Sequence, residues 1–305
     1  MNKSRQNKFN RSELKTDEFI LIFPNENQLE MYSILKDGNV LITVFLKKAW
    51  GTWNIGGWLL VEEGKDISLE NSTRLAAGST DWEYVFRVKR DTDTDYIFSG
   101  GNHGNEVLKS IQFIDADSDS EVKIEVGHMT KIKKLNIVEY TSLLIPQEGS
   151  VYAKVKRNYV IEPSKISLDT GFEFTSDIFM GTSYVCMFPV SKEYGRYINL
   201  GDNNEHYETP KYGETLTKED FENFYGMKKA LSATIWGGIN PNYKFKVSIK
   251  NPEMVDNFQN KLKTFYWDLN ESTNKLYFSK YDSEDDKKID AGTIWHNSAE
   301  WEFEF

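Results

Sequence analysis

Short segments in which apolar and polar residues alternate constrain the fold of this chain more than any other feature. In residues 82–90, aromatic and aliphatic side chains occupy every second position, and charged side chains fall mostly between them. The same period of two recurs in residues 107–113 and 243–249. Successive side chains of a β-strand point to opposite faces, so this period predicts strands with one buried face. The polar residues 91–95 and 270–274 separate strand-like segments and favour hairpin turns.

Many such strands joined by turns predict an all-β protein, an antiparallel β-sandwich or jelly roll. One or two short helices are expected beside the strands. Thr217 can cap a helix over residues 218–231. Asn251 can cap a second helix over residues 252–262, which would begin with a proline at its first position.

The chain has 305 residues, which is long enough for one large β domain. We expect a polar arm over residues 1–17, followed by a single β-sandwich domain over residues 18–305. A subdivision near residues 148–150 is the alternative. No apolar stretch opens the chain and none is long enough to span a membrane, so we expect no signal peptide and no membrane insertion. The expected location is the cytoplasm, where the protein is synthesised.

The amino-acid composition of the chain limits the kinds of ligand and partner that it can bind. The formal net charge of −10 argues against a nucleic-acid partner, because phosphate binding needs a basic surface. Aromatic residues make up 14% of the chain, which fits a β core and also fits surfaces that stack on sugar rings. Cys186 is the single cysteine, so no disulfide can form within the chain. Nucleotide-binding glycine motifs and the Gly-x-Ser-x-Gly esterase motif are absent from the sequence.

The glycine-rich segment Gly-Gly-Asn-His-Gly-Asn-Glu at residues 100–106 is the sharpest candidate for a chemical site. Glycines on both sides let the backbone turn tightly and leave the imidazole of His103 reachable. A histidine titrates near neutral pH and can act as a general acid, a general base or a metal ligand. Glu106 can orient His103 or stabilise its charge. Asn102, in the same turn, is assigned to substrate binding.

Two resemblances start from this segment. The spacing of His103 and Glu106 resembles the zinc-binding His-x-x-Glu motif of metallocarboxypeptidases, which implies zinc held by these residues and a third ligand, for which His206 is the nearest candidate. In that family a helix follows the motif, whereas here the alternating residues 107–113 predict a strand.

The second resemblance is broader and covers about residues 40–200. Trp82-Glu83-Tyr84, the glycine-rich segment, residues 111–115 and residues 184–189 together resemble β-sandwich modules of phage tail spikes and polysaccharide-degrading enzymes. This resemblance implies a surface or capsular glycan as substrate. It also implies association with a virion and a homo-oligomer, by analogy alone.

Two mechanisms of glycan cleavage use different residues of this chain. A lyase removes the proton beside a uronate carboxylate, so it needs a base and a group that neutralises the carboxylate. His103 or Tyr159 can be the base, and Arg87, Lys154 or Arg157 can neutralise the substrate.

A hydrolase needs two carboxyl groups across the sugar, for which Glu83 and Glu106 are the candidates. His128 follows an alternating segment and can face His103 across neighbouring strands.

The acidic residues 115–121 resemble the opening of a calcium loop, but the EF-hand positions for glycine and glutamate hold Ser120 and Val126. We therefore predict no cofactor, while these oxygens leave room for a divalent cation.

We predict a polysaccharide-degrading enzyme, with lyase chemistry ahead of hydrolysis. A different class of function is a non-catalytic glycan-binding or virion structural module, in which the aromatic residues only bind. A third is a zinc-dependent hydrolase that uses His103 and Glu106. The expected partner in the first two cases is a polysaccharide.

Overall fold

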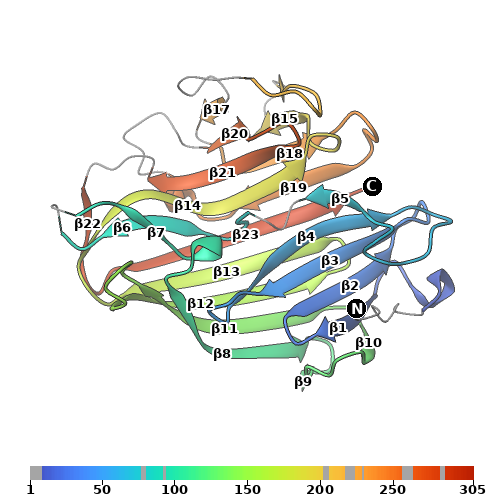
Figure 1. Cartoon of the computed structure of the whole chain (residues 1–305), viewed down its shortest axis with the longest axis horizontal. Helices are drawn as coiled ribbons and strands as arrows, with labels where there is room; N and C mark the ends of the chain where they lie inside the picture. The colour runs from blue at the N-terminus through green and yellow to red at the C-terminus, as the bar shows by residue number, and fades with distance from the viewer. Residues whose placement is uncertain are drawn as a thin grey trace, which may run out of the picture.

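The computed structural model describes residues 9–76, 80–91, 94–201, 206–216, 224–228, 230–255, 264–281 and 286–305. Within these residues, the strands form two sheets, one of thirteen strands and one of ten. Neighbouring strands run antiparallel, as the register of β11 against β12 and of β14 against β21 illustrates. Figure 1 shows the sheets lying one over the other, with β2–β4 in front of β11–β13.

The thirteen-stranded sheet begins at β10 and ends at β17 along its main path. Its strands, in order, are β10 (Met129–Ile132), β1 (Phe19–Asn25), β2 (Gln28–Ile34), β3 (Val40–Lys47), β4 (Trp53–Val61), β5 (Thr73–Ala76), β14 (Ile178–Ser191), β21 (Thr273–Tyr281), β20 (Thr264–Asp268) and β17 (Phe224–Lys228). Off this path, β6 (Val85–Lys89) and β22 (Lys287–Ile289) pair with β14, and β7 (Ile97–Ser99) pairs with β6.

The ten-stranded sheet runs from β16 to β9. Its strands, in order, are β16 (His206–Glu208), β15 (Tyr197–Leu200), β18 (Ser232–Trp236), β19 (Lys244–Ile249), β23 (Ile294–Glu304), β13 (Lys165–Phe174), β12 (Val151–Glu162), β11 (Leu135–Leu144), β8 (Glu106–Asp115) and β9 (Ser120–Glu121). Three short 3-10 turns complete the described elements: η1 (Arg11–Glu13), η2 (Gly101–His103) and η3 (Pro252–Met254).

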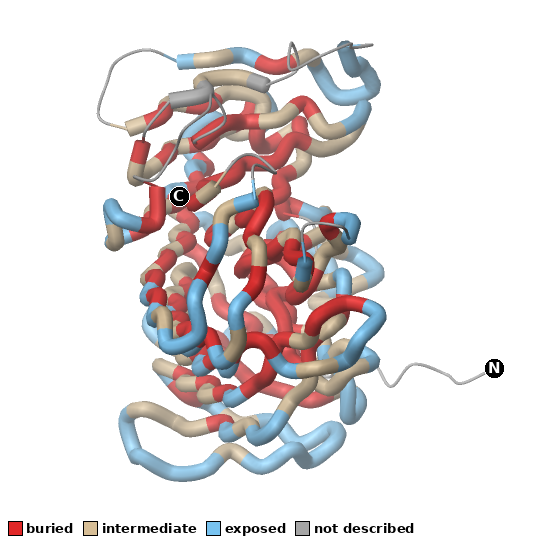
Figure 2. Tube along the Cα trace, turned by 90° about the vertical axis from the view of Figure 1, so that its left-hand side faces the viewer, coloured by how far each residue is buried: buried red, intermediate tan, exposed pale blue. Residues whose placement is uncertain are grey.

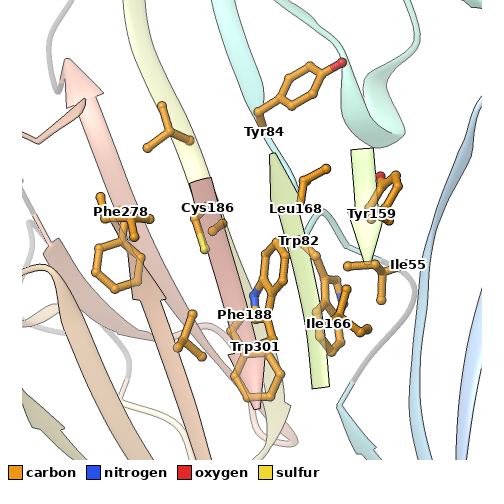
Figure 3. Packing of buried hydrophobic residues seen from close by; sticks show 14 of the residues in the cluster. Ile55, Trp82, Tyr84, Tyr159, Ile166, Leu168, Cys186, Phe188, Phe278 and Trp301 are labelled. Atoms are coloured by element: carbon orange, nitrogen blue, oxygen red, sulfur yellow. The ribbon is translucent and has the colours of Figure 1, made fainter. Parts of the chain in front are cut away.

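The core lies between the two sheets, where the alternating strands place their apolar side chains. In β12, for example, buried and partly exposed residues alternate over most of the strand. Large aromatic rings fill the centre: Trp82 packs edge-to-face on Phe188 with ring centroids 4.8 Å apart and lies 6.0 Å from the ring of Trp301. Figure 3 shows these three side chains together, and Figure 2 shows buried residues running along the interior of the molecule. The predicted antiparallel β-sandwich is confirmed.

The predicted helix over residues 218–231 is wrong where the chain is described. Residues 224–228 form β17, which pairs with β20 through Phe224 opposite Trp267. A sheet edge that needs backbone partners overrides the helical spacing of the side chains. Residues 217–223 and 229 lie outside the described residues. Of the second predicted helix, the turn η3 is present with proline at its start, and residues 256–262 lie outside the described residues.

Residues 9–17, which we predicted as part of a polar arm, pack on the outer face of the thirteen-stranded sheet. Phe9 and Leu14 are buried there in one cluster with Ile20 and Tyr32. The Phe9 ring meets Tyr32 edge-on at 5.0 Å, and the Arg11 guanidinium donates to the Gly38 carbonyl at 2.7 Å. This segment therefore covers strands β1–β3 on the side away from the core.

The segment at residues 148–150, the alternative domain boundary, is part of the tight turn between β11 and β12. These two strands pair along their whole length. Strands from before and after this turn also pair in the other sheet, where β14 joins β6. None of the described helical segments is long and apolar enough to span a membrane.

Candidate functional site

The glycine-rich segment joins β7 to β8 and contains the turn η2. Gly100, Gly101 and Gly104 have φ values of 88°, 56° and 72°, a region that side chains other than glycine rarely adopt. A Cβ on Gly101 would lie 2.1 Å from an oxygen of Asp81, so this position also needs glycine for space. The Asp81 carboxylate accepts a hydrogen bond from the backbone N–H of Asn102 and thereby holds the turn.

His103 reaches solvent from this turn, as the sequence predicts, with 40% of its side chain exposed. Its Nε2 atom lies 3.6 Å from the carboxylate of Asp81, which is nearly buried. Its ring stacks on Phe98 at 4.3 Å. Asp81 therefore takes the place beside His103 that we predicted for Glu106. Asn102 is partly exposed next to it.

Glu106 points into the sandwich instead. It is the first residue of β8, it is 2% exposed, and its Oε1 accepts hydrogen bonds from the hydroxyls of Tyr84 and Thr141, each at 2.6 Å. His206, the third residue of the zinc hypothesis, lies on the edge strand β16 beside Trp236. Among the described residues, no group of three or more His, Cys, Asp or Glu side chains is placed to hold a metal ion.

Glu83, Tyr159 and Arg157 also lie inside the sandwich, so their predicted contact with a substrate is not available in this structure. The Tyr159 hydroxyl donates to Glu83 at 3.1 Å, and Arg157 forms an ion pair with Glu139 in which neither side chain is exposed. Burial raises the pKa of Tyr159 well above its usual range, so its hydroxyl keeps its proton and cannot act as a base near neutral pH.

The buried carboxylates of Glu83 and Glu139 accept hydrogen bonds from the backbone of β4. The neighbouring strand β5 pairs with residues 58–60 of β4 and does not reach Trp53 and Ile55. It therefore offers no backbone acceptor to the N–H groups of these two residues. Glu139 accepts from the N–H of Trp53 at 2.8 Å, and Glu83 accepts from that of Ile55 at 2.7 Å. A buried N–H without an acceptor is costly, and these two glutamates satisfy both groups.

Arg87 lies near His103, whereas His128 lies far from it. The partly exposed Arg87 donates to the carbonyl of Tyr96 at 2.9 Å and lies 5.3 Å from the Phe98 ring centroid, on the same ring that His103 stacks on. His128 is exposed just before β10, at the opposite edge of the thirteen-stranded sheet from β6 and β7 (Figure 1). It therefore does not face His103.

Lys154, one of the predicted site residues, lies in an open pocket. This pocket has a volume of about 950 Å³ and lies on the outer face of the ten-stranded sheet, over β8, β11, β12, β13 and the start of β23. We call it the sheet-face pocket. Its lining residues are Lys109, Tyr140, Thr141, Ser142, Val151, Lys154, Val155, Lys156, Gly171, Phe172, Glu173, Thr175 and Ile294.

Strand register explains why these residues meet. One row of cross-strand partners consists of Ser142, Lys154, Glu173 and Ile294. Two residues along each strand, a second row on the same face places Tyr140 opposite Lys156, and Lys156 opposite Gly171. Residues that are paired across strands project from the same face of a sheet. The two rows therefore build one surface from four strands.

Gly171 leaves the middle of this surface open. It lies in the interior of β13, and a Cβ at this position would meet nothing within 4 Å. Its φ is not positive, so the backbone there does not require glycine. A glycine in a strand interior often marks a place where a ligand approaches the backbone closely.

Apolar and charged side chains share the sheet-face pocket. Tyr140, Val151 and Ile294 are 45%, 38% and 75% exposed, an unusual exposure for large apolar residues in one place. Lys154 forms an ion pair with Glu173 at 3.4 Å. An exposed ring with polar groups around it is typical of a small-molecule site.

Sequence reasoning missed Tyr140 and Gly171, although one signal was present. In residues 135–144 the inward positions include Glu139, and the outward ones include Tyr140. A charged residue inside and an aromatic residue outside reverse the ordinary pattern of a strand. Such a reversal is the kind of deviation that singles out a strand for closer attention.

No family model matches the sequence, and no curated protein matches it. Solved structures do match. The α-galactosidase from Lactobacillus brevis has a TM-score of 0.51 at 10% identity, over 92% of this chain and 40% of that chain. A GH36 α-galactosidase from Geobacillus stearothermophilus has a TM-score of 0.48 at 7% identity, over 90% and 40%.

The chain thus spans 40% of the length of these two enzymes, and the likeness to the first shows a shared fold. The shared fold is a β-sandwich found within a glycosidase chain. The sandwich part of the predicted resemblance is therefore supported, whereas the comparison supports neither the phage tail spike nor the lyase.

We expect Arg157→Ala to lower the free energy of unfolding by about 3–5 kcal/mol, because it leaves the Glu139 carboxylate buried and unpaired. Urea denaturation at pH 8 measures this. Lys154→Ala is the matched control, since Lys154 lies on the same strand with 62% of its side chain exposed. The control should change stability by less than about 0.5 kcal/mol. Equal small losses in both variants would contradict the role of the buried pair.

Stability should also depend on pH through Glu139. Burial raises the pKa of this carboxyl from 4.5 to about 7, against the opposing effect of Arg157. The folded protein then holds the proton more tightly than the unfolded chain, so this stabilisation is complete below pH 4.5 and is lost as pH rises through 7. Relative to Glu139→Gln, the wild type should lose stability across this window in urea denaturation. A difference that stays constant with pH would contradict this.

Proposed function

We propose that this chain is a carbohydrate-binding β-sandwich module that holds a saccharide in the sheet-face pocket. The observation that carries the proposal is the exposed ring of Tyr140 beside the open surface over Gly171, with lysines and a glutamate around it. A sugar ring has an apolar face of C–H groups and a rim of hydroxyls. Tyr140 can pack on the first, while Lys154 and Glu173 can hydrogen-bond to the second.

The shared fold supports a carbohydrate ligand. The Lactobacillus brevis protein is an α-galactosidase, which acts on a carbohydrate, and the present chain covers 40% of it. A module of this kind contributes binding, and any catalytic activity of a larger protein would depend on other parts of that protein. Binding rather than cleavage is favoured here because Glu83, Glu106 and Tyr159 are buried.

Glycan cleavage at His103 is the second candidate function. It is favoured by the pair of an exposed imidazole with the nearly buried Asp81 carboxylate at 3.6 Å. An exposed imidazole beside a carboxylate is a common arrangement for a residue that abstracts a proton from a substrate. With Glu83 and Glu106 both buried, the proposed hydrolytic pair has no access to a polymer, so a lyase base at His103 is the form of catalysis to test.

Filling the sheet-face pocket, or removing its exposed aromatic ring, should weaken binding without unfolding the protein. We expect Gly171→Leu and Tyr140→Ala each to weaken saccharide binding about tenfold or more, measured by affinity electrophoresis in gels that contain neutral or acidic polysaccharides. Gly171→Leu should leave thermal stability unchanged or slightly raised, because the backbone is ordinary and the space is empty.

Gly238→Leu is the matched control for this experiment. A Cβ at Gly238 also meets nothing within 4 Å, but the residue lies beyond the end of β18. It should bind as the wild type does. Retained binding in Gly171→Leu would remove the sheet-face pocket from the proposal.

Cleavage is tested by incubating the protein with the same polysaccharides and following new reducing ends and the absorbance of unsaturated uronates. If His103 is a lyase base, both signals rise in the wild type and fall at least about a hundredfold in His103→Ala. His206→Ala, an exposed histidine on β16, should retain them. Reducing ends alone would indicate hydrolysis, and the lack of both signals would leave binding as the function.

A further inference from the structure

The sheet-face pocket carries an excess of positive charge in an acidic protein. Its charged lining residues are three lysines, Lys109, Lys154 and Lys156, and one glutamate, Glu173. The whole chain has a formal net charge of −10. A local patch whose sign opposes that of the whole molecule attracts anions to one place and leaves the remaining surface repulsive to them.

A β-bulge brings Lys109 into this patch. Ser110 pairs with Tyr140 and Leu108 pairs with Thr141, so Lys109 is an extra residue between two pairs of the β8–β11 ladder. Such an insertion changes the direction in which a side chain points, and Lys109 and Ser110 are both exposed. Without the bulge, alternation would place these neighbours on opposite faces.

The other two lysines follow from regular register. Lys154 and Lys156 are separated by one residue on β12, which puts their Cα atoms about 7 Å apart on one face. Lys156 lies directly opposite Tyr140, and its Nζ is 5.7 Å from the centre of that ring. Lys109 lies on β8, the strand on the other side of Tyr140 from Lys156.

Each of these charges is available to a ligand. The Lys154–Glu173 pair has side chains that are 62% and 56% exposed, and such a surface pair contributes little stability. Lys109 has no ion-pair partner within the part of the chain that the structure describes. By contrast, the cation of Arg157 lies inside the sandwich, where it forms an ion pair with Glu139 and is out of reach of a ligand.

We propose that the sheet-face pocket selects acidic saccharides, namely pyranose rings that carry a carboxylate or a sulfate. This inference rests on the proposed binding function and specifies its ligand. The sugar ring packs on Tyr140 over Gly171, and its anionic group is held by Lys154 and Lys156 from one side or by Lys109 from the other. Lysine is a flexible point charge, so the pocket recognises the charge rather than the planar geometry of a carboxylate.

The decisive experiment compares binding of the same saccharide chain with and without its charged groups. Isothermal titration calorimetry of the full chain with oligogalacturonate is compared with its fully methyl-esterified form, and a sulfated galactan is compared with the same galactan after desulfation. We expect the charged form of each pair to bind at least about tenfold more tightly, and this preference to shrink as sodium chloride is raised. Preference in one pair alone identifies which anionic group is recognised.

The protein variants locate the effect. The triple variant Lys109→Gln, Lys154→Gln and Lys156→Gln should lose the preference for the charged form. A matched triple variant at Lys244, Lys246 and Lys250 changes the net charge equally, around β19 of the same sheet, and should keep it. Thermal melting verifies that both variants are folded, which is expected because all six side chains lie on the surface.

The outcomes separate this inference from the function on which it rests. If charged and uncharged forms bind equally, selection for acidic saccharides is wrong, while carbohydrate binding stands. If no saccharide binds, both are wrong. If both triple variants lose the preference to the same extent, the attraction comes from the overall charge and the sheet-face pocket is not its source.

Discussion

The buried ion pair of Arg157 and Glu139 is the interaction on which the arrangement of the two sheets depends. Both residues belong to the ten-stranded sheet, yet Glu139 also accepts the backbone N–H of Trp53 in the other sheet. Glu83 makes the complementary link, from the thirteen-stranded side to Tyr159. A charge inside a low-dielectric core is costly unless it has a partner, so these contacts between the sheets favour one way for the sheets to face each other.

This network also explains where function can and cannot lie. Side chains that satisfy buried N–H groups and carry buried charge cannot move toward a substrate without a large loss of stability. The carboxylates and tyrosine that suit catalysis by residue type are held in this way. Chemistry and binding are left to groups that project outward, which are His103 at its glycine turn and the sheet-face pocket on the opposite sheet.

Alternation in the sequence was sufficient to predict the β-sandwich, because a period of two in many segments has few other solutions. It does not say which face of a strand is buried when both faces hold polar residues. On β12, Lys154 and Lys156 lie on one face, and Arg157 and Tyr159 lie on the other. The sequence alone does not show which of these two polar faces is buried. The pairing of Arg157 with Glu139 and of Tyr159 with Glu83 places the second face inside. The strand β17 was missed for a related reason, since its partner β20 is distant in sequence.

The sheet-face pocket depends on features that carry no signal by residue type alone. Gly171 has an ordinary backbone conformation, so its role is the volume it leaves empty, which is visible only when Tyr140 and Lys156 are placed beside it. Lys109 joins the same face through a bulge, and a bulge can be read only from the register of two strands. The same sheet therefore has an inner face that holds the buried Arg157–Glu139 ion pair and an outer face whose charges remain available. Because the two faces alternate residue by residue along β11 and β12, the inner network holds the outer side chains in the register that forms the pocket.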